Sequence, residues 1–208
     1  VELLLEITNT GSGESPLIEH ILPLDCAFPV PAWPCTVHSM LGDLNSARSF
    51  MPMTDSMAPE NQGNTEIKRF LTFAPVGGRS SDEQMPFFNV QWQGGGAVMA
   101  IGWAGQWETT FECMPGRRLK MRSGMQLTHL RLHPGETIRT PRILLLFWSG
   151  DDDIHANNLF RRWMLACNLP RRNGEMVFAP ICGTVAETAP DGSYEEPHIR
   201  VMQPLAER

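Results

Sequence analysis

A short run with two tryptophans has the residue types of a surface that stacks against rings. Trp103 and Trp107 are four residues apart, and Gly102, Gly105 and Gln106 lie beside them. Large amphipathic rings next to backbone-permissive glycines, with an amide at hand, suit the binding of a sugar. The same run is typical of two core tryptophans at a tight bend, or of rings packed between two domains. All three interpretations stay open.

Upstream, a polar segment combines Arg79, Ser80, Ser81 and Asp82 directly after two glycines. The arginine offers a planar fork of donors that matches hydroxyls and carboxylates. The serines lack the glycine-flanked turn of a hydrolase nucleophile. We interpret the segment as a polar loop that approaches a sugar or the rim of another domain. The alternative is a surface turn held by an Arg–Asp pair.

Two further groups of residues have the chemistry of a site but not its spacing. Asp151, Asp152 and Asp153 are adjacent, so they cannot all point one way, and the spaced acids of a calcium loop are absent. We predict that they cap a helix. His129 and His133 share a face of any strand, but no third ligand follows for zinc. We therefore predict no catalytic residue and no metal ligand in this chain.

Short strands with period-two burial must position these residues. The expected strands are 1–8, 16–25, 66–74, 87–92, 97–103, 107–113, 119–123, 125–132 and 137–148. Residues 26–65 are rich in Pro, Gly, Ser, Asn and Met, and we predict a long irregular surface excursion there. Many short strands at this spacing favour a mainly β fold, an antiparallel β-sandwich over residues 1–150.

The pattern changes to helical spacing after the sandwich. We predict a linking helix and connector over residues 151–172, with the helix over 153–168 and its end before Pro170. Residues 173–208 read as one βα unit, in which an apolar strand over 176–182 precedes a capping-box pattern. Pro204 should break or kink the helix of that unit.

Composition limits the classes of protein to which the chain can belong. Hydrophobic residues make up 42% of the 208 residues and charged residues 19%, which is typical of a folded domain. The net charge of −6 argues against nucleic acid or an anionic membrane as a partner. No apolar run approaches the roughly 20 residues that a membrane span needs.

Five cysteines, an odd number without a Cys-x-x-Cys pair, argue against a disulfide framework. Free thiols favour a reducing compartment, and so a cytoplasmic location. The chain begins with Val1 in a strand-like segment, and no signal peptide is visible. We therefore expect the sequence to begin inside a domain.

Several motifs, in this order and spacing, resemble a known family. They are GGRSS (77–81), MPFFNV (85–90), LHPGETIRTPRILLL (132–146), FWSGDD (147–152) and NNLFRRWML (157–165). Together with the run around Trp103 they resemble the N-terminal β-sandwich, a supersandwich, of melibiase-type α-galactosidases, glycoside hydrolase family 36. The resemblance extends from Val1 to about Pro170, and residues 103–165 carry it most specifically.

The resemblance implies a non-catalytic N-terminal portion of a retaining enzyme that removes terminal α-linked galactose from oligosaccharides without a cofactor. Such enzymes use two aspartates of a (β/α)8 barrel, and none of the residues here corresponds to them. The chain would carry the sandwich and the opening βα unit of a truncated barrel. Its partners would be the enzyme's own barrel, an α-galactoside oligosaccharide and further copies in a homo-oligomer. The substrate-binding candidates are Arg79, Ser80, Ser81, Trp103, Gln106 and Trp107.

One departure from the family leaves alternatives open. After the first barrel strand the family usually carries a Trp-Gly-Gly-like turn, where this chain has residues 182–187, CGTVAE. A related glycosidase or transglycosidase therefore also fits. A stand-alone carbohydrate-binding β-sandwich module and a purely structural interaction domain are the hypotheses from other classes.

Overall fold

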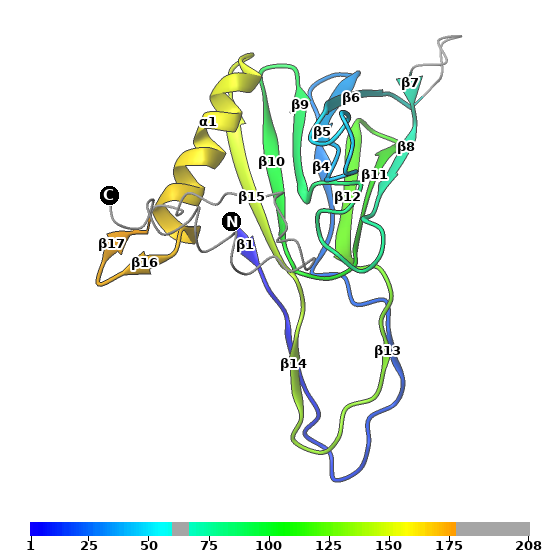
Figure 1. Cartoon of the computed structure of the whole chain (residues 1–208). Helices are drawn as coiled ribbons and strands as arrows, with labels where there is room; N and C mark the ends of the chain where they lie inside the picture. Colours follow the sequence, from blue (N-terminus) through cyan, green and yellow to red (C-terminus); the bar gives the residue numbers. More distant parts are fainter. Residues whose placement is uncertain (60–66, 178–208) are drawn as a thin grey trace, which may run out of the picture. The chain divides into compact units, whose positions relative to one another are not determined.

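The computed structural model of the chain describes residues 1–59 and 67–177. It divides into two compact units, Val1–Ala166 and Cys167–Arg208. The first unit is built mainly of antiparallel strands, as the spacing of apolar residues predicts (Figure 1). In the described part of the chain, no helix has the length and apolar character to cross a membrane.

Two large sheets make up the body of the first unit. The seven-stranded sheet has the order β1 (Glu2–Leu3), β15 (Arg142–Ser149), β10 (Gly95–Gly102), β9 (Phe87–Trp92), β5 (Cys35–Met40), β6 (Pro52–Met57) and β7 (Ile67–Lys68). The four-stranded sheet has the order β4 (Leu24–Pro29), β12 (Arg118–Met125), β11 (Trp107–Met114) and β8 (Phe70–Phe73). Neighbouring strands pair antiparallel, except β6 with β7.

One hydrophobic core joins the two sheets. Along β11, buried and half-buried residues alternate, so that Trp107 and Phe111 point inward from the four-stranded sheet. The ring of Phe88, on β9 of the other sheet, meets both of them edge-on at centroid distances of 5.9 and 5.4 Å. Side chains from both sheets therefore enclose a single buried layer, which is the arrangement of a β-sandwich.

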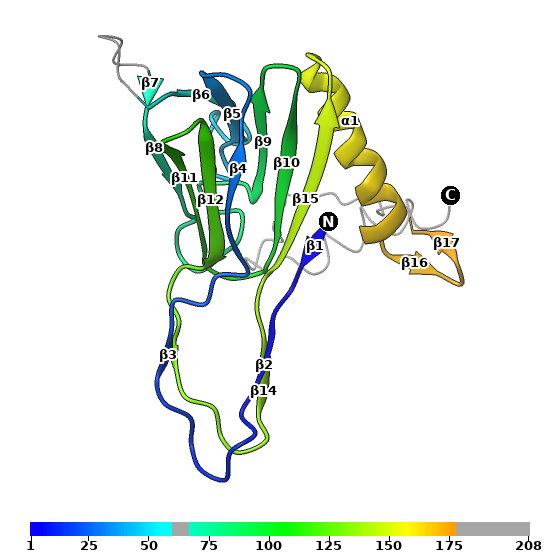
Figure 2. The same ribbon diagram turned by 180° about the vertical axis from the view of Figure 1, so that it is seen from behind.

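A helix, α1 (Asp153–Trp163), covers part of the outer face of the larger sheet (Figures 1 and 2). Its buried residue Ala156 packs with Val98 and Trp148 in a second, smaller core. Strand β10 is therefore enclosed on both faces, and its seven residues from Gly95 to Ile101 are all buried. Gly96 allows the Trp148 ring to lie close, because a Cβ there would be 2.6 Å from ring atoms.

The predicted helix is confirmed in its position and in its cap. Asp152 is the N-cap, and its side chain accepts a hydrogen bond of 3.0 Å from the backbone N–H of Ile154. A π-helical turn, η1 (Met164–Asn168), follows α1 and ends two residues before Pro170. Ile154, in the first turn of the helix, is 65% exposed, because the helix buries the side that carries Ala156.

The prediction of an irregular excursion over residues 26–65 is wrong in large part. Strands β4, β5 and β6 lie within or overlap that range, and β5 is a central strand between β9 and β6. Its alternating burial places Cys35 and Val37 in the main core. The sequence analysis missed this two-residue period because the residues between Cys35 and Val37 and after it, Thr36 and His38, are polar and point to the outer face.

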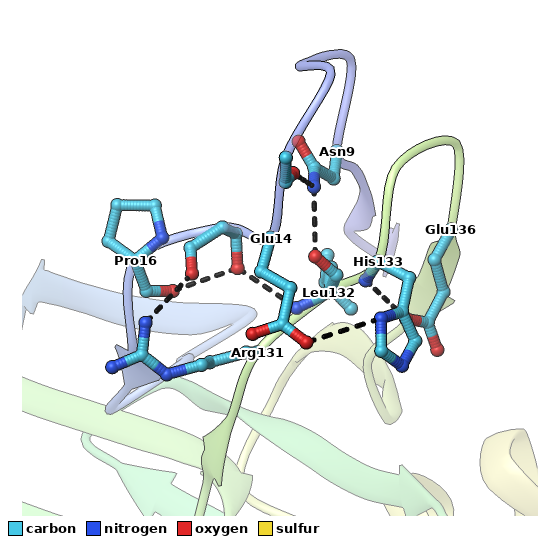
Figure 3. Close-up of polar contacts among 9 residues, drawn as sticks. Asn9, Glu14, Pro16, Arg131, Leu132, His133 and Glu136 are labelled. Atoms are coloured by element: carbon cyan, nitrogen blue, oxygen red, sulfur yellow. Dashed lines mark hydrogen bonds and ion pairs between the residues drawn. The ribbon is translucent and has the colours of Figure 1, made fainter.

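Two narrow ribbons extend from one end of the sandwich (Figures 1 and 2). One pairs β2 (Glu6–Thr8) with β14 (Thr137–Arg139), and the other pairs β3 (Ile18–Glu19) with β13 (His129–Leu130). Strands β13 and β14, which lie on either side of residues 133–136, therefore pair with the N-terminal strands β3 and β2. Backbone and side-chain hydrogen bonds join the ribbons near their tip, where Asn9 donates to the Leu132 oxygen at 2.8 Å (Figure 3).

The second unit contains a small hairpin in its described part. Strand β16 (Arg171–Arg172) pairs antiparallel with β17 (Glu175–Met176). The apolar strand predicted over 176–182 lies outside the described residues beyond Val177, as does the helix predicted after it. The division at residues 150 and 172 stays a prediction.

Candidate functional site

The polar loop at residues 76–84 connects β8 to β9 and lies against the segment that follows β5. Leu41 bridges to Gln84, and Asp43 bridges to Asp82. The Asp43 N–H donates to the Ser81 oxygen at 2.9 Å. Two segments that are about forty residues apart in the sequence are thus in direct backbone contact.

Gly42 makes this contact close. A Cβ at position 42 would lie 2.0 Å from the Ser81 oxygen and 2.7 Å from the Ser81 carbonyl carbon. Both are backbone atoms, so no side-chain rotation could relieve the overlap. The loop can therefore reach its observed position only with glycine at 42.

Two of the predicted residues, Gln106 and Trp107, form hydrogen bonds with the backbone of the loop or of the residue just before it. The indole N–H of Trp107 donates to the Ser80 oxygen at 2.9 Å, although the Trp107 ring itself is fully buried. The Gln106 Oε1 accepts from the Gly78 N–H at 3.0 Å, and its Nε2 donates to the Pro75 oxygen. Both side chains therefore position the loop.

The loop and the segment after β5 line a polar cleft of about 350 Å³. Its charged and amide-bearing side chains are those of Asp43, Asn45, Arg79, Asp82 and Glu83. Arg79 forms an ion pair with Asp82, and its own side chain is 78% exposed. Carboxylates, an amide and a guanidinium are the donors and acceptors that recognise sugar hydroxyls.

Asp43 is held as a carboxylate within this cleft. Its Oδ1 accepts from the backbone N–H of Asn45 at 2.8 Å and from the Ser49 hydroxyl at 3.0 Å. These hydrogen bonds, more than the nearby Arg79, lower the pKa of Asp43 below its ordinary value. A carboxyl with a lowered pKa accepts hydrogen bonds well but is a poor proton donor near neutral pH.

Trp103 lies apart from the cleft. Its half-buried ring packs against the main core at the turn after β10. The exposed part lines a separate hollow of about 180 Å³ with Gly102, Gly105 and Arg139. The two tryptophans that are neighbours in the sequence therefore face different surroundings, one in the core and one beside this hollow.

The structure brings five of the six predicted residues to one place, since Gln106 and Trp107 contact the loop that carries Arg79, Ser80 and Ser81. Sequence reasoning missed Asp43 and Asn45. A signal was present, because an Asp followed two residues later by Asn, with serines nearby, is typical of an Asx-turn. Contact of the six residues with a substrate stays a prediction.

The other polar clusters have structural partners. His129 pairs with Glu19 at 2.8 Å and His133 with Glu14 at 3.5 Å, both on the exposed ribbons. The second pair is drawn in Figure 3. Across residues 1–59 and 67–177, no group of three His, Cys, Asp or Glu side chains could hold a metal ion.

The first unit is a two-sheet β-sandwich with a covering helix, and several solved structures are similar in fold to about two thirds of the chain. The α-galactosidase from Lactobacillus brevis matches 69% of this chain with a TM-score of 0.54 and 16% identity. The galactosidase domain of an α-galactosidase–sucrose kinase matches 70%, with a TM-score of 0.50 and 16% identity. The GH36 α-galactosidase AgaA from Geobacillus stearothermophilus matches 69%, with a TM-score of 0.50 and 17% identity.

The chain spans only about a fifth of the length of these structures, 19%, 20% and 19% respectively. A variant of AgaA, with a TM-score of 0.50 and 15% identity, was solved in complex with raffinose. No protein-family model and no curated protein matches the chain. The predicted resemblance to family 36 α-galactosidases is therefore confirmed for the fold.

Proposed function

We propose that this chain is the non-catalytic N-terminal portion of a retaining, α-galactosidase-like glycoside hydrolase that releases terminal α-linked galactose from oligosaccharides. The observation that carries the proposal is the structural match to an α-galactosidase over 69% of this chain but only 19% of that protein. The sequence motifs over residues 77–165 support it independently. The cytoplasmic location, the homo-oligomer and the opening of a barrel over 173–208 belong to the proposal.

In this proposal the cleft around Arg79 contacts either the galactoside hydroxyls or the barrel rim. The exposed guanidinium of Arg79, beside the carboxylates of Asp43 and Glu83, supplies donors and acceptors for that contact. Gln106 and Trp107 keep the loop in place, and so act through it. Ser80 and Ser81 supply backbone oxygens that are already bonded to Trp107 and Asp43. Trp103 would present its exposed edge to the barrel.

Catalysis is assigned to residues beyond this chain. Retaining glycosidases need a nucleophile and a proton donor about 5–5.5 Å apart. A proton donor needs a raised pKa, whereas the pKa of Asp43 is lowered. Asp152 is engaged as a helix cap. The chain should therefore bind and position, without turnover of its own.

The test compares the purified chain with a protein extended by the downstream sequence of its gene. We expect no hydrolysis of an aryl α-galactoside by the chain and steady turnover by the extended protein. Hydrolysis by the chain alone, or none by a correctly folded extended protein, contradicts the proposal. In the extended protein, Arg79→Ala should raise KM for raffinose by about tenfold, as the loss of a charged hydrogen bond does. Arg161→Ala, on the exposed side of α1, is the matched control.

A stand-alone carbohydrate-binding module is the alternative, and the presence of a complete cleft within the chain favours it. That function requires the chain alone to bind a saccharide at Arg79. Calorimetric titration of the chain with raffinose, repeated with Arg79→Ala, distinguishes the two. Heat that disappears in the Arg79→Ala variant supports the module. A binding heat that is the same in Arg79→Ala, or no binding heat in either protein, supports the proposal that the chain is the N-terminal portion of an enzyme.

A further inference from the structure

A second cavity, of about 460 Å³, lies on the outer face of the seven-stranded sheet beside α1. Along β5 and β9, Val37 and Val90 point into the main core, so the adjacent His38 and Asn89 point to the opposite, outer face. The cavity opens on that face between β5, β6, β9 and the helix. Its size is within the range of sites for small ligands. It shares no lining residue with the cleft around Arg79.

One wall of the cavity is apolar and contains aromatic rings. Phe87 on β9 and Phe160 on α1 are in contact, with centroids 5.2 Å apart and planes tilted by 55°. Met40 and Pro52 face them from β5 and β6, where they are register partners. Such a wall can pack against the C–H face of a ring.

Asn89 provides a buried hydrogen-bond donor without a partner. Its Oδ1 accepts from the Trp148 indole at 3.0 Å, and an indole N–H can only donate. This contact sets the orientation of the amide, with Nδ2 directed away from Trp148. The residue is 4% exposed, and its Nδ2 has no hydrogen-bond partner. A buried donor of this kind is unfavourable unless something accepts from it.

Further polar groups surround the same space. Asp153 and Asn157 are four residues apart on α1, so both present their side chains on one helix face toward the cavity. Thr54 lines it from β6, with its hydroxyl 3.5 Å from Nδ1 of His38, which also lines the cavity. Lysine and arginine are absent from the described lining, so the site lacks the charge that an anionic ligand requires.

We propose that this cavity binds a neutral, hydroxylated ring, one monosaccharide unit, independently of the cleft around Arg79. The ring's C–H face packs on Phe87 and Phe160. A ring hydroxyl accepts from Asn89 Nδ2, which has almost no accessible surface, so the lining side chains shift to admit it. Other hydroxyls bond to Asp153, Asn157 and Thr54. The site would tether a saccharide to the sandwich. It does not depend on the proposed enzymatic function, because every residue in it belongs to the first unit.

The test is a titration of the ¹⁵N-labelled 208-residue chain, followed by proton–nitrogen correlation spectra. The probes are methyl α-D-galactopyranoside, methyl α-D-glucopyranoside and, as an apolar ring of similar size, cyclohexanol. We expect a glycoside to shift the side-chain amide signals of Asn89 and Asn157 with saturation in the millimolar range, and cyclohexanol to bind at least about tenfold more weakly. No saturable shift, or equal binding of cyclohexanol, overturns the proposal. Shifts confined to residues 76–84 support the Arg79 cleft instead and also overturn it.

Three variants locate the binding. Asn157→Trp fills the cavity and should abolish binding, whereas Asn158→Trp, on the adjacent exposed residue outside the cavity, should bind as the unchanged chain does. Asn89→Asp retains the oxygen that accepts from Trp148 and removes the Nδ2 donor, so affinity should fall by about tenfold. Near-ultraviolet circular dichroism monitors the fold of each variant. Unchanged binding by Asn157→Trp overturns the proposal regardless of how Asn89→Asp folds.

Discussion

The fully buried ring of Trp107 is bonded to the backbone of a surface loop, through a 2.9 Å hydrogen bond from its Nε1 to the Ser80 oxygen. The ring packs against Phe88 in the centre of the sandwich. The position of the polar cleft is thereby coupled to the packing of the core. A residue type that suggests sugar stacking in the sequence has a positioning role in the fold.

Replacing Trp107 by Phe should loosen the loop while leaving an aromatic ring in the core. The Ser80 oxygen loses its donor, and the smaller ring leaves space, so unfolding free energy should fall by about 2–4 kcal/mol. Urea denaturation measures the loss, and amide hydrogen exchange at residues 76–84 should accelerate. Trp103→Phe, at the half-buried ring of the same turn, is the control and should cost less than about 1.5 kcal/mol. Equal effects of the two substitutions would contradict this role.

Gly42→Ala should displace the loop or destabilise the sandwich. The new Cβ would overlap the Ser81 oxygen at 2.0 Å, and overpacking of this kind costs about 1–3 kcal/mol or more. Thermal unfolding provides the measurement. Gly13→Ala has no atom within 4 Å of its new Cβ and should leave the midpoint unchanged within error. A normal melting temperature and unchanged loop signals in Gly42→Ala would mean that the contact is not close in solution.

Asp152→Ala should weaken the start of α1, because the Ile154 N–H loses its acceptor. The expected loss is about 0.5–2 kcal/mol, as for other helix caps. Asp152→Asn keeps a capping oxygen and should restore most of the stability. Far-ultraviolet circular dichroism during urea titration reports both. A larger loss in Asp152→Asn than in Asp152→Ala would contradict the capping role.

Two buried thiols should be inert and should make stability depend on alkaline pH. Burial raises the pKa of Cys35 to about 12 and that of Cys113 to about 11, from an ordinary value of 9.0. Iodoacetamide at about pH 8 should therefore modify the exposed Cys26 and leave these two until the protein unfolds. Peptide mass mapping identifies the modified sites.

The sign of the pH effect follows from the raised pKa values. Below about pH 9 both states keep the thiols protonated, and the stability that the buried neutral thiols contribute is fully present. Above that pH the unfolded chain releases protons that the folded one retains, so stability falls as pH rises toward 11–12. Urea midpoints at about pH 8 and about pH 10.5 test this, and Cys35→Ala should reduce the difference. If the urea midpoint fell equally between the two pH values in Cys35→Ala, the pH effect would come from other groups.

Local patterns predicted the elements whose partners are close in the sequence. The hairpins β9–β10 and β11–β12 have short turns, so their alternation and their pairing are read from one stretch of chain. The helix α1 was predicted with its cap because Asp152 acts on Ile154, two residues away. Strand β5 was missed because β9, one of its partners, is about fifty residues distant. Its alternation of small, polar and apolar residues is weak evidence for a strand without that partner.

Spacing within short segments of the sequence was enough to predict the mainly β character, the capped helix and the resemblance to α-galactosidases. It also indicated Arg79, Gln106 and Trp107 as candidate site residues, and their contact with a substrate stays a prediction. The fold was needed to show that Trp107 is buried while Trp103 keeps an exposed edge, and that Asp43 lies beside Ser81. The spacing of side chains along the sequence indicates which residues share one face of a strand or helix. Burial and long-range contact depend on which distant segment covers that face, and that is a property of the packed chain as a whole.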